Sequence, residues 1–160
     1  MDNDQTLPVD RPRTLMLPPA PYAAALVGGW WLDRHVLPLG LSLGEFTRPL
    51  AWLLVAAGLG LMGWTFLEFR RHRTTVNPYA AATRLCVGGP FRFSRNPIYL
   101  GDWLILVGLS LWLATWWPIL FAPAVWLMLR YWVIRHEEDH LEAKFGQEFR
   151  DYKASVRRWI

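Results

Sequence analysis

The chain has 160 residues, of which 53% are hydrophobic and 11 are tryptophan. A single soluble core of this size would not hide so much aromatic surface, so the composition favours a membrane protein over a water-soluble one. The formal net charge is +4, but no nucleic-acid-binding motif accompanies the arginines. We therefore assign the positive charge to membrane topology and to contact with lipid headgroups, and we expect no nucleic-acid partner.

Taken in chain order, the first 14 residues are acidic and proline-rich and predict a cytosolic lead-in without a cleaved signal peptide. The remainder, residues 15–160, is expected to form a single domain. Four apolar runs predict membrane spans at about residues 15–32, 50–69, 98–113 and 116–133. Only the second has the full length of about 20 apolar residues, so the others are expected to be tilted or partly interfacial. The predicted fold is all-α and polytopic.

Basic residues concentrate before the first span, between the second and third spans, and after the fourth. Such an excess of arginine and lysine is typical of cytoplasmic segments, so both termini and the loop at residues 70–95 are predicted to be cytoplasmic. The opposite face would then hold the loop from Asp33 to Arg48 and a tryptophan-rich turn at residues 115–118, a composition typical of membrane interfaces.

Charged segments bracket the hairpin made by the last two spans. A basic, proline-punctuated segment at residues 88–101 leads into it, and an acidic segment at residues 136–142 follows it. These charges would be costly in hydrocarbon without partners, and a two-span hairpin returns the chain to the same face of the bilayer. We expect the two segments to lie side by side and to form a polar pocket above a lipid-facing cavity.

The end of the chain predicts an amphipathic cytosolic helix at about residues 134–157. Six side chains spaced by three or four residues would share one face of it: Glu138, Leu141, Phe145, Phe149, Tyr152 and Val156. Gly146 lies in the middle of this helix and is a candidate bend. Packing or membrane contact would explain the apolar members of this face, but it would not explain the adjacent carboxylates of Glu137 and Glu138.

Two motifs in the second half of the chain resemble a known signature. They are GPFRFSRNPIYLG at residues 89–101 and the Glu137-Glu138 pair with the Leu141, Phe145-Gly146, Phe149 and Tyr152 that follow it. Their order and separation resemble the isoprenylcysteine carboxyl methyltransferase and phospholipid methyltransferase superfamily, and residues 75–78 resemble the lead-in of its bacterial members. One departure is Asn96, which stands where many relatives have histidine; an amide cannot carry a proton at neutral pH.

The resemblance implies a bacterial inner-membrane enzyme that uses S-adenosylmethionine to methylate a lipophilic acceptor at the cytosolic face. The acceptor would be an isoprenylcysteine-like carboxylate or a phospholipid amine. The cofactor-binding residues that it implies are Arg95, Asn96, Pro97, Tyr99, Gly101, Glu137 and Glu138. The candidate catalytic residues are Arg92, Asp102 and Arg130.

Physical chemistry gives these candidates roles. Carboxylates suit the ammonium, sulfonium and ribose hydroxyls of S-adenosylmethionine, whereas an arginine such as Arg92 or Arg130 suits a carboxylate or phosphate. Asp102 lies just inside the third predicted span, where a carboxylate is costly unless it faces a cavity or a partner. Asp102 or Glu137 would be the candidate base if the acceptor is an amine.

Two other interpretations of the acidic pair are open. It could be a surface salt-bridge partner of Arg130 or Arg135, because Arg130 and Glu137 are seven residues apart and would share a side of one continuous helix. Residues 136–140 also fit the zinc motif His-Glu-x-x-His. A catalytic zinc usually takes a third protein ligand, however, and no histidine follows His140, so we expect no metal.

Two alternative functions also remain. Sterol reductases of the same broad superfamily use NADPH, although they usually have more spans than this chain. A non-catalytic membrane scaffold would account for the apolar spans and the basic loops, but it would leave the paired motifs unexplained.

Overall fold

The structure, a computed structural model, describes residues 17–72 and 84–160. This part of the chain is helical, with no strand, which confirms the predicted all-α class. The helices are α1 (Ala20–His35), α2 (Thr47–Arg71), the 3₁₀ turn η1 (Gly89–Arg92), α3 (Pro97–Trp112), α4 (Trp117–Leu120), α5 (Ala122–Met128), the π-helical segment η2 (Leu129–Ile134), α6 (Arg135–Phe145) and α7 (Gln147–Ser155). The motif at residues 75–78 lies outside the described residues.

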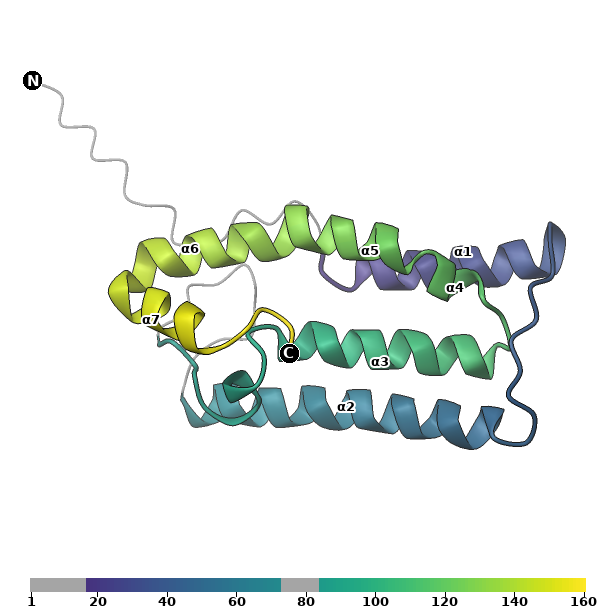
Figure 1. The fold of residues 1–160 in the computed structure, drawn as a ribbon, viewed down its shortest axis with the longest axis horizontal. Coiled ribbons are helices and arrows are strands. Elements are labelled where there is room, and N and C mark those ends of the chain that lie inside the picture. The colour runs from purple at the N-terminus through teal and green to yellow at the C-terminus, as the bar shows by residue number, and fades with distance from the viewer. Residues whose placement is uncertain (1–16, 73–83) are drawn as a thin grey trace, which may run out of the picture.

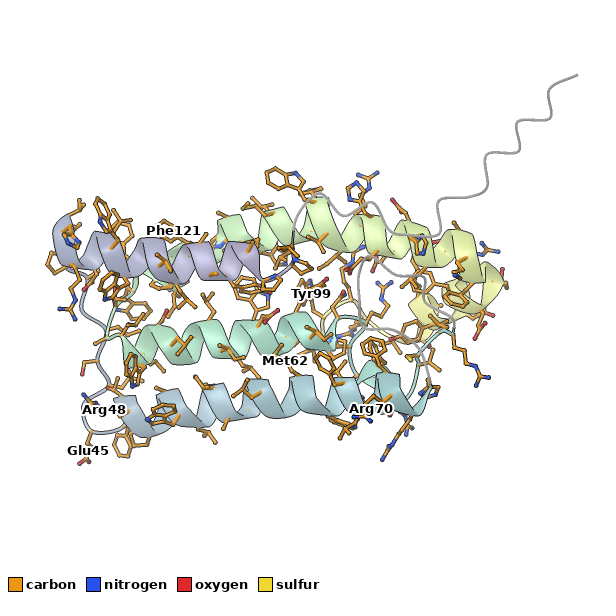
Figure 2. The ribbon with its side chains drawn as sticks, turned by 180° about the vertical axis from the view of Figure 1, so that it is seen from behind. Glu45, Arg48, Met62, Arg70, Tyr99 and Phe121 are labelled. Carbon is orange, nitrogen blue, oxygen red and sulfur yellow. The ribbon has the colours of Figure 1, made fainter. Side chains whose placement is uncertain are left out.

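Figure 1 shows two layers of helices: α2 lies along α3, and α1 lies with α4, α5 and α6 on the other side of α3. Glycines allow α2 and α3 to approach closely. A Cβ atom on Gly58 of α2 would lie 2.6 Å from the carbonyl oxygen of Gly101 on α3. A Cβ atom on Gly101 would lie 2.7 Å from Cγ of Met62, which is labelled in Figure 2. Small residues at such contacts are typical of helix packing in membranes.

The stretch Gly44–Arg71, which contains α2, is long and apolar enough to cross a membrane, with a mean hydropathy of 1.9 over its 18-residue apolar window. No other helix of the described residues meets both conditions. The large apolar side chains that α2 exposes are Trp52, Leu53, Leu59, Trp64, Phe66 and Leu67. Helices α1 and α3 have 16 residues each, or about 24 Å at 1.5 Å per residue, which is shorter than the hydrocarbon core of about 30 Å. The other three spans therefore remain predictions.

The boundary predicted near residue 133, between the fourth span and a C-terminal helix, is not a break in the structure. Helices α5, η2 and α6 follow one another from Ala122 to Phe145. The π-helical turn η2 lies where the boundary was predicted and joins α5 to α6. Its residues Leu129, Val133 and Ile134 are fully buried.

The chain instead breaks at Gly146, the candidate bend, so one continuous helix over residues 134–157 is not confirmed: α6 ends at Phe145 and α7 begins at Gln147. Gly146 has a φ of +55°, a conformation that favours glycine. Helix α7 begins directly after it and folds back beside α6 (Figure 1).

The apolar face of α6 and α7 packs on the protein itself. Phe149 and Tyr152 form a buried cluster with Cys86 and Phe91, which precede α3 in the chain. The Tyr152 hydroxyl donates a hydrogen bond of 2.8 Å to the carbonyl oxygen of Phe91. This cluster ties the end of the chain to the segment that carries the first motif.

Candidate functional site

The basic and acidic segments meet at one end of the bundle, as predicted. Nη1 of Arg95, just before α3, lies 3.0 Å from Oε1 of Glu138 on α6. The hydroxyl of Tyr99, in the first turn of α3, donates a hydrogen bond of 2.8 Å to Oε1 of Glu137. Figure 2 shows Tyr99 on the side of α3 that faces the α5–α6 layer. The hairpin therefore brings both motifs into direct contact.

Glu138 is buried between two arginines. Besides Arg95, it is held by Arg158, whose Nε and Nη2 lie 3.1 and 2.5 Å from its two carboxylate oxygens. The alternative made the acidic pair a salt-bridge partner of Arg130 or Arg135, but the ion-pair partners of Glu138 within the described residues are Arg95 and Arg158. The guanidinium of Arg130 lies 5.0 Å from the ring centre of Trp126. Paired arginines give this carboxylate a fixed position and orientation.

Glu137 is in a different electrostatic position. Burial raises the pKa of its carboxyl to about 7; the hydrogen bond from Tyr99 acts in the opposite direction, and the neighbouring charge of Glu138 adds to the rise. A carboxyl with this pKa exchanges a proton near neutral pH, whereas Glu138 is held as the ion-pair partner of Arg95 and Arg158. Glu137 is thus suited to proton transfer, and Glu138 is suited to holding arginine side chains in place.

The side chain of Asn96 is buried and turned toward the end of the chain. Its Nδ2 donates a hydrogen bond of 2.8 Å to the carbonyl oxygen of Arg158. Its backbone N–H donates to Oγ of Ser94, which itself donates to the same Arg158 carbonyl oxygen. Pro97 is fully buried in the first turn of α3, where its fixed φ suits the start of a helix.

Other predicted site residues lie elsewhere. Gly101 faces α2, so its visible role is helix packing. Arg92 ends η1 and is exposed, and neither Arg92 nor Arg130 forms a hydrogen bond or ion pair with Arg95 or Glu138 in the described part of the chain. Asp102 is partly buried, three residues after Tyr99 on α3. The structure thus gathers Arg95, Asn96, Tyr99, Glu137 and Glu138, with Asp102 about one turn further along.

Residues 136–140 fit the zinc motif in sequence, but Glu137 of that motif accepts the hydrogen bond from Tyr99. Within residues 17–72 and 84–160, no group of three or more His, Cys, Asp or Glu side chains is placed to hold a metal ion. A zinc site on this helix has no third ligand there to complete it.

Two charged residues at this end of the molecule were not predicted. Arg158 carries no signal in the sequence, because it stands in a short basic tail, 20 positions from its partner. Glu68 is buried near the end of α2, where Oε1 would lie 2.3 Å from a Cβ atom on Gly88. An acidic residue at the end of an apolar span could have indicated Glu68. The Gly88-Gly89 pair, with a φ of +53° at Gly89, makes room for its carboxylate.

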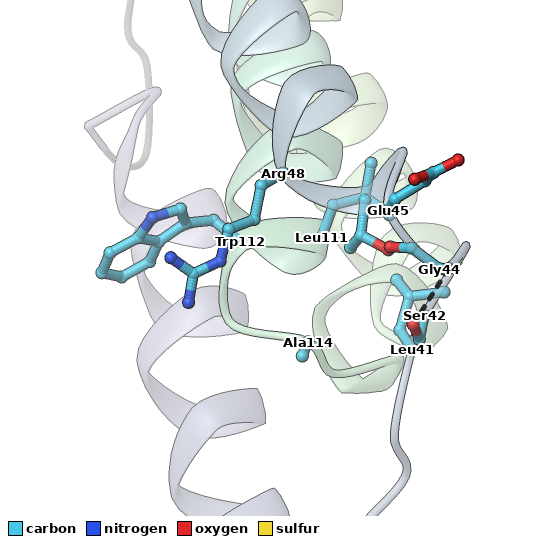
Figure 3. Close-up of a pocket in the computed structure, with 9 residues that line it drawn as sticks. Leu41, Ser42, Gly44, Glu45, Arg48, Leu111, Trp112 and Ala114 are labelled. Carbon is cyan, nitrogen blue, oxygen red and sulfur yellow. Dashed lines mark hydrogen bonds between the residues drawn. The ribbon is translucent and has the colours of Figure 1, made fainter.

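A cavity of about 330 Å³ lies at the opposite end of the bundle, where α2 begins and α3 ends. Figure 3 shows Arg48 and Trp112 beside it. Figure 2 places Arg48 and Arg70 at the two ends of α2. This cavity is therefore separate from the cluster around Glu138.

The family model described as phospholipid methyltransferase matches residues 46–148, a range that contains Arg95, Tyr99, Glu137 and Glu138. The chain belongs to the phospholipid methyltransferase family. An uncharacterized protein of Haemophilus influenzae is 41% identical to it over 63 residues, which cover 39% of this chain and 100% of that protein. No solved structure matches the chain. Membership confirms the superfamily resemblance and indicates a membrane-associated methyltransferase that acts on lipid-like substrates.

The raised pKa of Glu137 predicts a pH-dependent stability. The ordinary pKa of this carboxyl is 4.5 and the folded value is about 7, so the folded protein holds the proton more tightly than the unfolded chain. The resulting stabilisation is complete below pH 4.5 and is lost as the pH rises through 7. The Tm in detergent should therefore fall over this interval, and Glu137→Gln should flatten the fall. Thermal unfolding across this range is the measurement, and an equal slope in both proteins would contradict the assignment.

Proposed function

We propose that this chain transfers a methyl group from S-adenosylmethionine to a lipophilic acceptor at the cytosolic membrane face. The observation that carries the proposal is the cluster in which Arg95 and Glu138 form an ion pair beside the hydrogen-bonded Tyr99 and Glu137. The acceptor would approach from the bilayer, where α2 exposes apolar side chains.

The polar groups of the cluster fit the charges of S-adenosylmethionine. The Arg95 side chain is only 12% exposed, and its Nε makes no hydrogen bond within the described residues. A buried donor without an acceptor costs about 1–3 kcal/mol, so this N–H suits a ligand carboxylate. The carboxylates of Glu137 and Glu138 suit the ammonium and the ribose hydroxyls.

S-adenosylmethionine, when bound, would supply an electrophilic methyl group on a positively charged sulfur. The chain contributes mainly by holding donor and acceptor in attack geometry. A carboxylate acceptor needs no general base, and Arg92 or Arg130 would orient it. An amine acceptor must lose a proton, which Glu137 would accept at its carboxylate because its pKa lies near neutral pH. Asp102, about one turn further along α3, is the second candidate base.

Ligand-dependent stability tests the proposal against its alternatives. S-adenosylhomocysteine at 100 times its Kd should stabilise the detergent-solubilised protein by about 2.7 kcal/mol, since it binds only the folded state. NADPH at the same concentration should have no effect. Stabilisation by NADPH alone would indicate a reductase, and stabilisation by neither ligand would favour a scaffold. Mass spectrometry of lipid extracts incubated with a labelled methyl donor would identify the acceptor.

We also propose a cytoplasmic location for both termini in a bacterial inner membrane. A cysteine at Ser155, an exposed position at the end of α7, should not react with a membrane-impermeant thiol reagent in intact cells and should react after lysis. Ser42→Cys, exposed at the other end of the bundle, should react in both conditions. The native Cys86 is buried and gives little background. Labelling of Ser155→Cys in intact cells would contradict this topology and indicate the opposite orientation.

A further inference from the structure

The last five residues return to the candidate site and are called here the C-terminal strap (residues 156–160). Figure 1 shows the C-terminus beside the start of α3. The backbone N–H of Arg95 donates a hydrogen bond of 3.1 Å to the carbonyl oxygen of Arg157. Trp159 packs against the buried cluster that contains Tyr99. The strap is thus attached to the same segment that supplies Arg95 and Tyr99.

Arg158 is fixed at both of its ends. Its carbonyl oxygen accepts hydrogen bonds from Nδ2 of Asn96 and Oγ of Ser94, at 2.8 and 3.3 Å. Its guanidinium meets Glu138 through Nε and Nη2 together. Two parallel N–H···O contacts of this kind set the orientation of a carboxylate as well as its charge. Asn96 and Glu138 are therefore connected through a single residue.

This connection has an electrostatic consequence for Arg95. One carboxylate between two guanidinium groups leaves the trio with a net charge of +1. Glu138 is shared with Arg158, and although Nη1 of Arg95 lies 3.0 Å from Oε1 of Glu138, the Nε of Arg95 has no acceptor within the described residues. Arg95 thus keeps positive charge and a hydrogen-bond donor for an anionic group of a ligand.

We propose that Arg158 is a positioning residue of the methyl-donor site and that the Asn96 amide acts through it. In this role Asn96 needs only an N–H donor and no titratable proton, which fits an amide at the position where many relatives have histidine. Arg158 lies outside residues 46–148, the range that matches the family model. The inference rests on the proposed function, because it concerns the same S-adenosylmethionine site.

The strap offers a matched control. Arg157 is the neighbour of Arg158 and carries the same charge, but its side chain is exposed and has no ion pair within the described residues. In calorimetric titrations with S-adenosylhomocysteine, Arg158→Ala should bind at least about tenfold more weakly, whereas Arg157→Ala should bind like the wild type. Arg158→Lys should recover part of the affinity, since lysine keeps the charge but not the paired contact.

Kinetics separates positioning from a merely structural role. Arg158→Ala should raise the KM for S-adenosylmethionine more than it lowers kcat. Asn96→Ala should have an effect in the same direction. The double variant should be no worse than Arg158→Ala, because Asn96 holds the backbone of Arg158 and can act on Glu138 only through the Arg158 side chain. If Arg158→Ala does not fold, Arg158→Lys carries the test, with weaker binding at an unchanged Tm as the expected result.

Two negative results are distinguishable. A wild-type protein that binds S-adenosylhomocysteine, together with Arg158→Ala and Arg157→Ala variants of equal affinity, would overturn the role of Arg158 and leave the proposed function standing. A wild-type protein that does not bind S-adenosylhomocysteine would overturn both.

Discussion

Replacing Glu138 with glutamine should weaken S-adenosylhomocysteine binding by about ten- to a hundredfold. The substitution keeps the size of the side chain and removes the charge that Arg95 and Arg158 both contact. Loss of a charge-assisted hydrogen bond in such a site costs roughly 1.5–3 kcal/mol, which corresponds to that change in affinity. Isothermal titration calorimetry of the detergent-solubilised protein is the measurement. Arg95→Ala should weaken binding to a similar degree.

Glu142→Gln is the matched control for this experiment. Glu142 lies four residues further along α6, and its partly exposed carboxylate forms ion pairs with Nζ of Lys153 at 2.8 Å and with Nη1 of Arg150 at 3.8 Å. The substitution is chemically the same and also weakens ion pairs, but pairs that are open to solvent on one side contribute little free energy. Affinity should stay at the wild-type level. Unchanged affinity in Glu138→Gln and Arg95→Ala would contradict a cofactor site at this position. The acidic pair would then have only a structural role.

Convergence of the two motifs could be predicted because it depends on a coarse property of the chain. Two consecutive antiparallel helices return the chain to the same end of a bundle, whatever their exact boundaries. Side-by-side placement of the two motifs needs only this return, and the ion pair between Arg95 and Glu138 shows that the motifs meet. Prediction of the all-α class likewise needed only the apolar runs and their lengths.

The partner of each acidic residue could not be predicted in this way. A relationship between Arg130 and Glu137 at a spacing of seven assumes a regular helix between them, but η2 (Leu129–Ile134) is π-helical. A π-helical turn holds more residues than an α-helical one, so it rotates the residues that follow relative to those before it. Periodicity alone therefore misplaces the face on which Glu137 and Glu138 lie.

The contact of Arg158 with Glu138 could not be predicted from the sequence for a related reason. Gly146, with its positive φ, reverses the chain between α6 and α7. A bend at this glycine was a candidate in the sequence, but its direction follows from the backbone angles and from the packing of Phe149 and Tyr152 on Phe91. The tail reaches Glu138 only because of that reversal. No local sequence pattern around Arg158 indicates this chain reversal.

A second substitution with a large expected effect is Gly58→Ala, which should lower the Tm by several degrees. The added Cβ atom would lie 2.6 Å from the carbonyl oxygen of Gly101 and 2.8 Å from Cγ1 of Ile105. The nearer neighbour is backbone, so α2 and α3 must move apart, and such overpacking costs about 1–3 kcal/mol. The higher helix propensity of alanine over glycine offsets at most about 1 kcal/mol of this cost. For a chain of this size the net loss corresponds to about 2–4 °C per kcal/mol.

Gly60→Ala is the control for this contact, because a Cβ atom at Gly60 on the same helix has no neighbour within 4 Å. Its Tm in detergent should equal or exceed that of the wild type. Gly101→Ala approaches the contact from α3, where the Cβ atom would lie 2.7 Å from Cγ of Met62 and 2.9 Å from the carbonyl oxygen of Gly58. We expect it to lower the Tm while the folded protein keeps its affinity for S-adenosylhomocysteine, since Gly101 faces α2. A loss of affinity at an unchanged Tm would instead place Gly101 in the ligand site, as the family resemblance implies.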